Sequence, residues 1–305
     1  MNTLRVATIG CVLATLLGVA IGLLRLSDNP LLAALTSAYV EALRNVPVLL
    51  QLVFWHALLL RLPPVRAAFH PLPGVYLSQR GVVLPAIEWN DDLWLTVAAM
   101  ALAVLLAVAN AWHARQHQAR TGERRAVWHQ NLILLLALPA VAITACGVVP
   151  DVSVPALAGF NFEGGVTLSP EFAALLFGLT VYASAFIAEI VRAGIQAVDK
   201  GQWEAARALG LRDRRIVRLI ILPQALRVIV PPLTSQYLNL TKNSSLAVVI
   251  GYPDLVSVAS TAINQTGQAI EIIAIFMTIY LALSLLTAAA MAWYNRRIAL
   301  RGSPG

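Results

Sequence analysis

The chain has 305 residues, of which 59% are hydrophobic and only 12% are charged, and its mean hydropathy is +0.74. Soluble domains carry about 25% charged residues, so this composition excludes a soluble globular protein and indicates an integral membrane protein. The net charge of +7 comes largely from arginines in alternate loops, which is typical of membrane topology rather than of nucleic-acid binding. Cys11 and Cys146 both lie in apolar runs, so they are interpreted as packing residues rather than a disulfide or metal pair.

Apolar segments of spanning length recur along the chain and predict an all-α polytopic membrane protein. About seven transmembrane helices are expected, at residues 6–24, 39–55, 93–112, 132–149, 171–191, 226–250 and 270–294. Pro47 is expected to kink or restart the second helix. Glu41 and Arg44 are three residues apart, so they can form a surface pair on one helix face. The segment 61–92 is rich in proline and glycine and is expected to be a loop.

The charges of the loops predict an orientation in the membrane. Alternating the seven segments places the basic stretches 113–129 and 192–227 and the tail 296–305 on one side, opposite Asp151 and Asp254. The positive-inside rule makes the basic side cytoplasmic, so the C-terminus is expected inside and Met1 outside. Because an outside N-terminus with almost no leader is awkward for insertion, we expect an upstream segment, one further span and a cytoplasmic tail, to be missing.

The most structured loop is the polar stretch from Asp199 to Pro223, DKGQWEAARALGLRDRRIVRLIILP. Asp199 can cap a helix, and Gln202 lies three residues on, as in a capping box. Gly210 suits the left-handed position just past a helix end, and Pro223 suits the first turn of the next helix. A basic, structured loop on this side indicates a docking surface, although an ordinary amphipathic connector would show the same local signals.

Polar groups inside membrane segments are costly and often functional, which makes several of them candidates for a translocation pathway. These candidates are Glu189, Gln236, Asn239, Lys242, Asn243, Ser244 and Ser245. The alternative is structural, because such residues can also cap broken helix ends or lie at the membrane interface.

Other function classes receive less support from the sequence. His113 and His117 are four residues apart, but no carboxylate or cysteine completes a set, so we expect no metal site. No nucleophile–base pair is evident, so no catalytic residue is assigned and a membrane enzyme is not expected. A channel or an ATP-independent secondary transporter for small polar solutes is the remaining alternative; secondary transporters often contain internal repeats, and the 199–223 stretch has no internal match.

One spacing within the loop is specific enough to indicate a family. The residues fit the pattern EAA-x3-G-x9-I-x-LP through Glu204, Ala205, Ala206, Gly210, Ile220, Leu222 and Pro223. This resembles the EAA loop of bacterial binding-protein-dependent ABC importer permeases of type I. The flanking residues 39–47, 192–198 and 242–246 are similar to the polar amino-acid subfamily. The extra spans within 61–170 resemble the enlarged permeases of general L-amino-acid and glutamate/glutamine/aspartate/asparagine importers.

The resemblance implies a layout: the first two spans in 1–60, a subfamily insertion in 61–170, core helices with the coupling loop in 171–295, and the basic cytoplasmic tail 296–305. It also implies partners in the bacterial inner membrane: a second, related but different permease, two cytoplasmic ATPases and a periplasmic amino-acid-binding protein. ATP and Mg²⁺ would then be bound by the ATPases, and this chain, which lacks a GxxxxGK[ST] loop, would hold no cofactor. Residues 199–209 would form the coupling helix, with Ala205 and Ala206 seated against an ATPase.

Overall fold

The computed structural model describes residues 2–87, 93–121, 127–146, 152–159 and 161–299, which form two compact units. The first unit comprises 1–69, 77–82 and 168–305, and the second comprises 70–76 and 83–167. Each unit is described by itself below.

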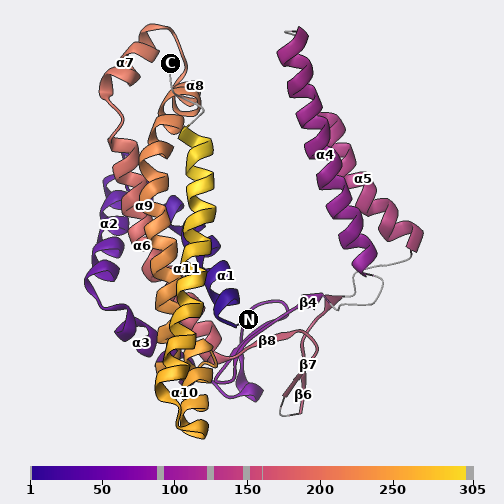
Figure 1. Ribbon diagram of the computed structural model, residues 1–305, viewed down its shortest axis with the longest axis vertical. Coiled ribbons are helices and arrows are strands. Elements are labelled where there is room, and N and C mark those ends of the chain that lie inside the picture. Colours follow the sequence, from indigo (N-terminus) through magenta and orange to yellow (C-terminus); the bar gives the residue numbers. More distant parts are fainter. Residues whose placement is uncertain (1, 88–92, 122–126, 147–151, 160, 300–305) are drawn as a thin grey trace. The chain divides into compact units, whose positions relative to one another are not determined.

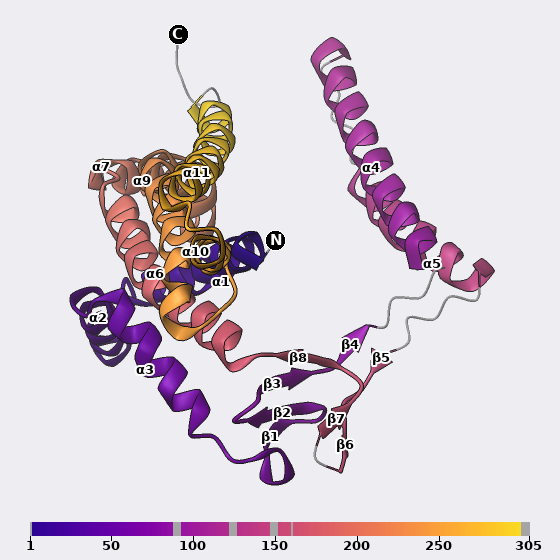
Figure 2. The same ribbon diagram turned by 60° about the horizontal axis from the view of Figure 1, so that its bottom comes forward.

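The first unit is a helical bundle (Figure 1). Its helices before the second unit are α1 (Asn2–Leu24), α2 (Pro30–Asn45), α3 (Val48–Leu60) and the 3-10 turn η1 (Val65–Ala67). Its later helices are α6 (Pro170–Gln196), α7 (Lys200–Ala208), α8 (Asp213–Ile216), the π-helical η2 (Val217–Ile221), α9 (Leu222–Asn243), the 3-10 helix η3 (Ser244–Ile250), α10 (Leu255–Thr266) and α11 (Ala269–Ala299). Helix α6 is the centre of the bundle, because α1, α2, α3 and α9 all pack against it (Figure 2).

Small residues allow α1 and α6 to pack closely. A Cβ atom added to Gly18 would lie 2.7 Å from Cβ of Ile187, and one added to Gly22 would lie 2.8 Å from the carbonyl oxygen of Ala188. These two glycines are four residues apart and therefore lie on the same face of α1. The spacing corresponds to the GxxxG pattern that brings membrane helices together by close backbone packing.

The second apolar segment is sharply broken, as Pro47 predicts. Helix α2 ends at Asn45, and α3 begins at Val48 at an angle of 105°. The bend leaves carbonyl groups at the end of α2 without helical partners, and the side-chain amide of Gln51 donates to two of them, those of Leu43 and Val46, at 2.9 Å each. Gln51 therefore stabilises the break by satisfying two carbonyl groups at the end of α2.

The second unit contains a helix pair and most of the short strands. Its helices α4 (Leu93–Thr121) and α5 (Trp128–Cys146) pack against each other, and the Asn110 amide donates to Oδ1 of Asn131 at 2.9 Å. The strands are β1 (Phe69–Leu72), β2 (Val75–Ser78), β3 (Gly81–Leu84), β4 (Ala86–Ile87), β5 (Val152–Ser153), β6 (Ala156–Ala158), β7 (Asn161–Glu163) and β8 (Val166–Leu168). Strands β1, β2, β3 and β8 form one sheet in that order, while β4 pairs antiparallel with β5 and β6 with β7. Strands β1 to β4 thus occupy part of the segment 61–92, which was expected to be a loop.

The described helices fit a protein that crosses a membrane several times. Five stretches are long and apolar enough to span, namely Asn2–Leu24, Ala98–Gln118, Pro170–Gln196, Asp213–Ile250 and Ala269–Arg296. The bent pair of α2 and α3 passes the same test as a sixth, and α5 contributes a shorter apolar helix at Trp128–Val141. The expectation of about seven membrane helices is consistent with this set.

Candidate functional site

Helix α7 is bounded by the residues that the sequence singled out. The Asp199 carboxylate accepts a hydrogen bond from the backbone N–H of Gly201 at 2.5 Å. At the other end, Gly210 has φ +73°, its N–H donates to the carbonyl of Arg207, and the N–H of Leu211 donates to that of Ala206. This pair of hydrogen bonds is a Schellman motif, so the prediction for Gly210 is confirmed.

The predicted capping box is only half formed. The side chain of Gln202 accepts a hydrogen bond from the amide of Gln224 at 3.3 Å. Because Gln202 is turned toward α9, its contact joins α7 to the next long helix instead of closing the first turn of α7.

The motif residues of α7 divide between two faces. Ala206 is 1% exposed and packs in the core cluster with Ile216 and Ile221, whereas Glu204 and Ala205 are exposed. The expectation that Ala206 seats directly against an ATPase is therefore corrected, since its methyl group anchors α7 to the bundle. Leu209 is 80% exposed and was missed, although an apolar residue just before the helix-ending glycine could have drawn attention to it.

The chain continues from Gly210 into α9 through a π-helical segment. Ile216 and Ile221 are five residues apart, both are buried, and the π-helix between them places both on one side. Ile220 is half-buried, whereas Leu222 and Pro223 are exposed. Pro223 lies in the first turn of α9, where its missing N–H was expected to be tolerated.

Four of the pathway candidates follow one side of α9. Gln236, Asn239 and Asn243 follow a spacing of three and four residues, and Lys242 lies three residues after Asn239 at the edge of the same helix face. Asn239 and Lys242 are exposed and the other two are half-buried. Within the part of the chain that the structure describes, none of these four side chains forms a hydrogen bond or ion pair. A membrane-embedded face with unused polar groups is suited to a hydrated path or a partner.

The two serines at the end of α9 behave differently. The Ser244 hydroxyl donates to the carbonyl of Thr241, and the Ser245 hydroxyl donates to that of Lys242, both at 2.7 Å. They satisfy carbonyls where α9 changes into the 3-10 helix η3, which is the structural alternative considered for these residues.

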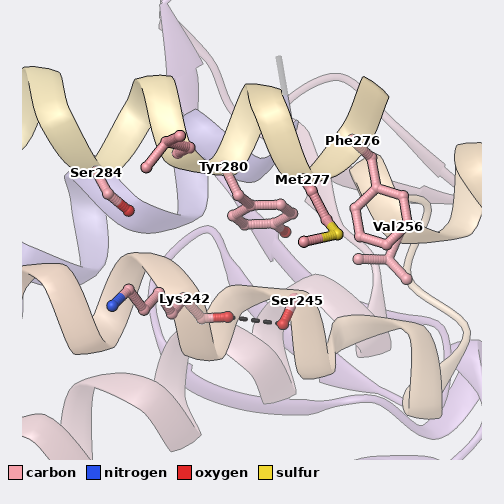
Figure 3. Close-up of a pocket in the computed structure, with 8 residues that line it drawn as sticks. Lys242, Ser245, Val256, Phe276, Met277, Tyr280 and Ser284 are labelled. Atoms are coloured by element: carbon pink, nitrogen blue, oxygen red, sulfur yellow. Dashed lines mark hydrogen bonds between the residues drawn. The ribbon is translucent and has the colours of Figure 1, made fainter. Parts of the chain in front are cut away.

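A cavity of about 540 Å³ lies beside Lys242 and Ser245, between α9, α10 and α11. Figure 3 shows Tyr280, Met277 and Phe276 reaching from α11 into this space, with Ser284 one turn from Tyr280. Its volume is within the range of about 300–1,000 Å³ that is usual for small-molecule sites. Sequence reasoning missed Tyr280 and Ser284, although two polar residues four apart in an apolar span are a usable signal.

Glu189 does not line this cavity. Its carboxylate forms an ion pair with Arg25 and another with Arg192 at 2.5 Å, and the Arg44 guanidinium lies 3.9 Å away. Glu189 therefore links α6 to α2 and to the residue that follows α1. Arg44 also lies over the ring of Phe186, so the expected pair between Glu41 and Arg44 is replaced by these contacts.

Among the residues that the structure describes, no cluster of three or more His, Cys, Asp or Glu side chains is placed to bind a metal ion. His117 instead contacts the hydroxyl of Thr121 at 3.0 Å.

The first unit thus combines a polytopic helical bundle with a capped polar helix in one of its loops. Residues 123–300 match the family described as "Binding-protein-dependent transport system inner membrane component", and the chain belongs to that family.

Similar proteins cover almost the whole chain. It is 50% identical to "Putative amino-acid ABC transporter permease protein YhdX" of Escherichia coli (strain K12), over 98% of this chain and 77% of that protein. It is 45% identical to "General L-amino acid transport system permease protein AapQ" of Rhizobium johnstonii, over 98% of this chain and 75% of that protein. A solved amino acid ABC transporter crystallised with histidines has a TM-score of 0.56 at 22% identity, covering 97% of this chain and 90% of that one, which supports the fold.

Proposed function

We propose that this chain is the permease subunit of an ATP-driven, binding-protein-dependent importer of polar L-amino acids. The family membership establishes a transport component, and two relatives that match 98% of this chain are described as amino-acid permeases. The observation that carries the proposal is the combination of a membrane bundle with an ordered polar helix, α7, whose outer face is left uncovered.

The outer face of α7 is the proposed docking surface for a cytoplasmic ATPase. Glu204, Ala205 and Leu209 are exposed there, while Ala206 fixes the helix to the core formed with Ile216. A rigid attachment on one face and an open surface on the other would let the helix transmit movement of the ATPase to α6 and α9. The excess of arginine in this loop supports a cytoplasmic location for the loop and for the C-terminus.

The face of α9 and the cavity beside it form the proposed pathway for the amino acid. The Lys242 ammonium can pair with a substrate carboxylate, and the hydroxyls of Tyr280 and Ser284 can form hydrogen bonds with its polar groups. Phe276 and Met277 would contact the apolar part of the substrate. Gln236, Asn239 and Asn243 would extend the polar face along the helix.

The remaining assignments follow from this role. A second permease, two ATPases and a periplasmic binding protein complete the importer, and the ATPases hold ATP and Mg²⁺. The chain itself is proposed to carry out no chemical reaction. The family description, a binding-protein-dependent transport system, supports the participation of a binding protein.

Reconstitution into liposomes tests the proposal. The chain, its partner permease and the binding protein are assembled with and without the ATPase, and uptake of labelled L-amino acids is measured. We expect uptake only with the ATPase and ATP. Uptake by the membrane subunits alone would instead identify an ATP-independent transporter.

Substitution of Lys242 tests the pathway separately. Lys242→Gln is expected to reduce uptake at least tenfold, because about 1.4 kcal/mol of a charge-assisted contact corresponds to that factor. Lys242→Arg keeps the positive charge and should retain most of the uptake. Equal uptake by Lys242→Gln and the unchanged transporter would remove Lys242 from the pathway while leaving the subunit assignment intact.

A further inference from the structure

Four arginines lie close together where the coupling loop re-enters the bundle. These are Arg212, Arg214, Arg215 and Arg218, and all four are exposed. The neighbouring acid, Asp213, is already paired with Arg207 at 3.2 Å. Across the described parts of the chain, none of the four guanidinium groups has an ion pair or side-chain hydrogen bond. The segment from Arg212 to Arg218, here called the arginine segment, thus presents uncompensated positive charge.

Exposed aliphatic side chains accompany the arginine segment. Leu219 is 63% exposed, and Val217 and Leu222 are also exposed. Each of these three residues lies next to an arginine of the segment or within one helical turn of such an arginine. The opposite side of the same helix is fixed to the bundle by Ile216 and Ile221. A surface that offers guanidinium groups and hydrocarbon together matches the boundary between phospholipid headgroups and acyl chains.

We propose that the arginine segment binds the phosphate headgroup of an anionic phospholipid in the cytoplasmic leaflet. The proposal rests on the cytoplasmic orientation given above. The segment lies at the start of the candidate span Asp213–Ile250, which is where headgroups are located. Guanidinium groups bind phosphate oxygens through paired N–H donors, and Leu219 and Leu222 would lie against the acyl chains.

An acidic surface on the ATPase is the competing partner for these arginines. Helix α7 already provides an exposed face for that docking, with Glu204 and Leu209 directed outward. A water-soluble ATPase would match the guanidinium groups, but Leu219 and Leu222, unlike Leu209, lie within the candidate span Asp213–Ile250, where hydrocarbon is the expected neighbour. The combined chemistry therefore favours lipid.

The test measures binding of a fluorescent short-chain phosphatidylglycerol to the full chain in neutral detergent. We expect saturable binding, and at least tenfold weaker binding of the matching phosphatidylcholine. Each arginine near an anionic membrane surface contributes about a fivefold factor, so Arg214→Gln with Arg218→Gln should weaken binding about 25-fold. The matched control, Arg5→Gln with Arg61→Gln, removes two exposed charges elsewhere in the first unit and should leave binding unchanged. Equal weakening by both pairs would overturn the proposal.

Two further measurements distinguish the possible ligands. Leu219→Ser should also weaken phosphatidylglycerol binding, because hydrocarbon contact is part of the site. Displacement of the lipid by inorganic phosphate at comparable concentrations would instead show a site for free anions and would refute lipid binding. Co-purification of the ATPase should be unaffected by Arg214→Gln with Arg218→Gln. Loss of the ATPase from that variant with unchanged lipid binding would assign the arginines to the ATPase interface and overturn the proposal.

Discussion

Replacement of Gly210 by valine directly tests the coupling role that we propose for the loop at residues 199–223. Gly210 has φ +73°, and a Cβ atom at this position would have no heavy atom within 4 Å apart from those of Gly210 itself and its two chain neighbours. The added Cβ atom therefore meets no other element of this chain, and the substitution acts mainly through the backbone conformation. The left-handed conformation costs an L-residue about 1–2 kcal/mol, and a β-branched residue more.

That energy can be converted into an expected loss of function. A cost of about 1–2 kcal/mol reduces the population of the Schellman turn by about 5- to 30-fold. If the substituted valine instead adopts negative φ, the hydrogen bonds that close the turn onto Arg207 and Ala206 are lost. Either outcome disorders the end of α7. We expect recovery of the partner ATPase and ATP-dependent uptake to fall in the order Gly, Asn, Ala, Val at position 210, because asparagine tolerates positive φ best among the three replacements.

The assay combines ATPase co-purification with uptake in liposomes, and the yield in the membrane fraction reports insertion, which should not change. Gly267→Val is the matched control. Gly267 has φ +71° and equally open surroundings, but it ends α10 and not α7. It should lower stability by a similar amount without releasing the ATPase. Normal uptake by Gly210→Val, or equal loss of ATPase from both variants, would refute the reasoning.

Three other predictions concern charge, packing and pH. Glu204→Lys reverses an exposed charge on α7 and should greatly reduce ATPase recovery at an unchanged thermal midpoint; unaltered recovery would reject the proposed contact. Gly18→Ala places a methyl group 2.7 Å from Cβ of Ile187 and should destabilise the chain by about 1–3 kcal/mol. Gly10→Ala would meet leucine methyl groups, the nearest of them at 3.3 Å, and should be tolerated because these side-chain ends can shift; equal thermal midpoints of the two variants would contradict this. Burial raises the pKa of the Asp254 carboxyl group, which is 2% exposed, so folding favours the neutral acid. The free energy of unfolding is therefore higher at low pH, and this gain is lost as the pH rises through the raised pKa of the folded chain. Asp254→Asn should retain the helix cap and flatten the dependence of the thermal midpoint on pH, and an unchanged slope would count against it.

Local backbone chemistry was predictable from the sequence. Asp199 as a helix cap, Gly210 in the left-handed region and the break at Pro47 depend on residues that restrict or permit particular φ values over a few positions. The same local rules did not predict the hydrogen bond between Gln202 and Gln224, because these residues are 22 positions apart and belong to different helices.

Residue roles that depend on the packing of distant helices were harder to predict from the sequence. Glu189 looked like a pathway residue because it is an acid in an apolar span, but its partners Arg25 and Arg44 become neighbours only when α1 and α2 pack on α6. Ala205 and Ala206 are identical in chemistry, and only the packing of α7 on Ile216 separates an exposed alanine from a buried one. The pathway role of Lys242 remains a prediction.

The π-helical segment at Val217–Ile221 makes the chain sensitive to length as well as to composition. An ordinary α-helix advances about 100° per residue, and the π turn accommodates one residue more than an α turn between Ile216 and Ile221. Deleting any one residue here would restore α-helical winding and keep the amino-acid composition almost unchanged. Because five residues of π-helix and four residues of α-helix both complete about one turn, α7 would keep almost the same rotation relative to α9. An insertion has no such compensation, because the π turn already holds one extra residue, so we expect insertions at this joint to be more harmful than single deletions.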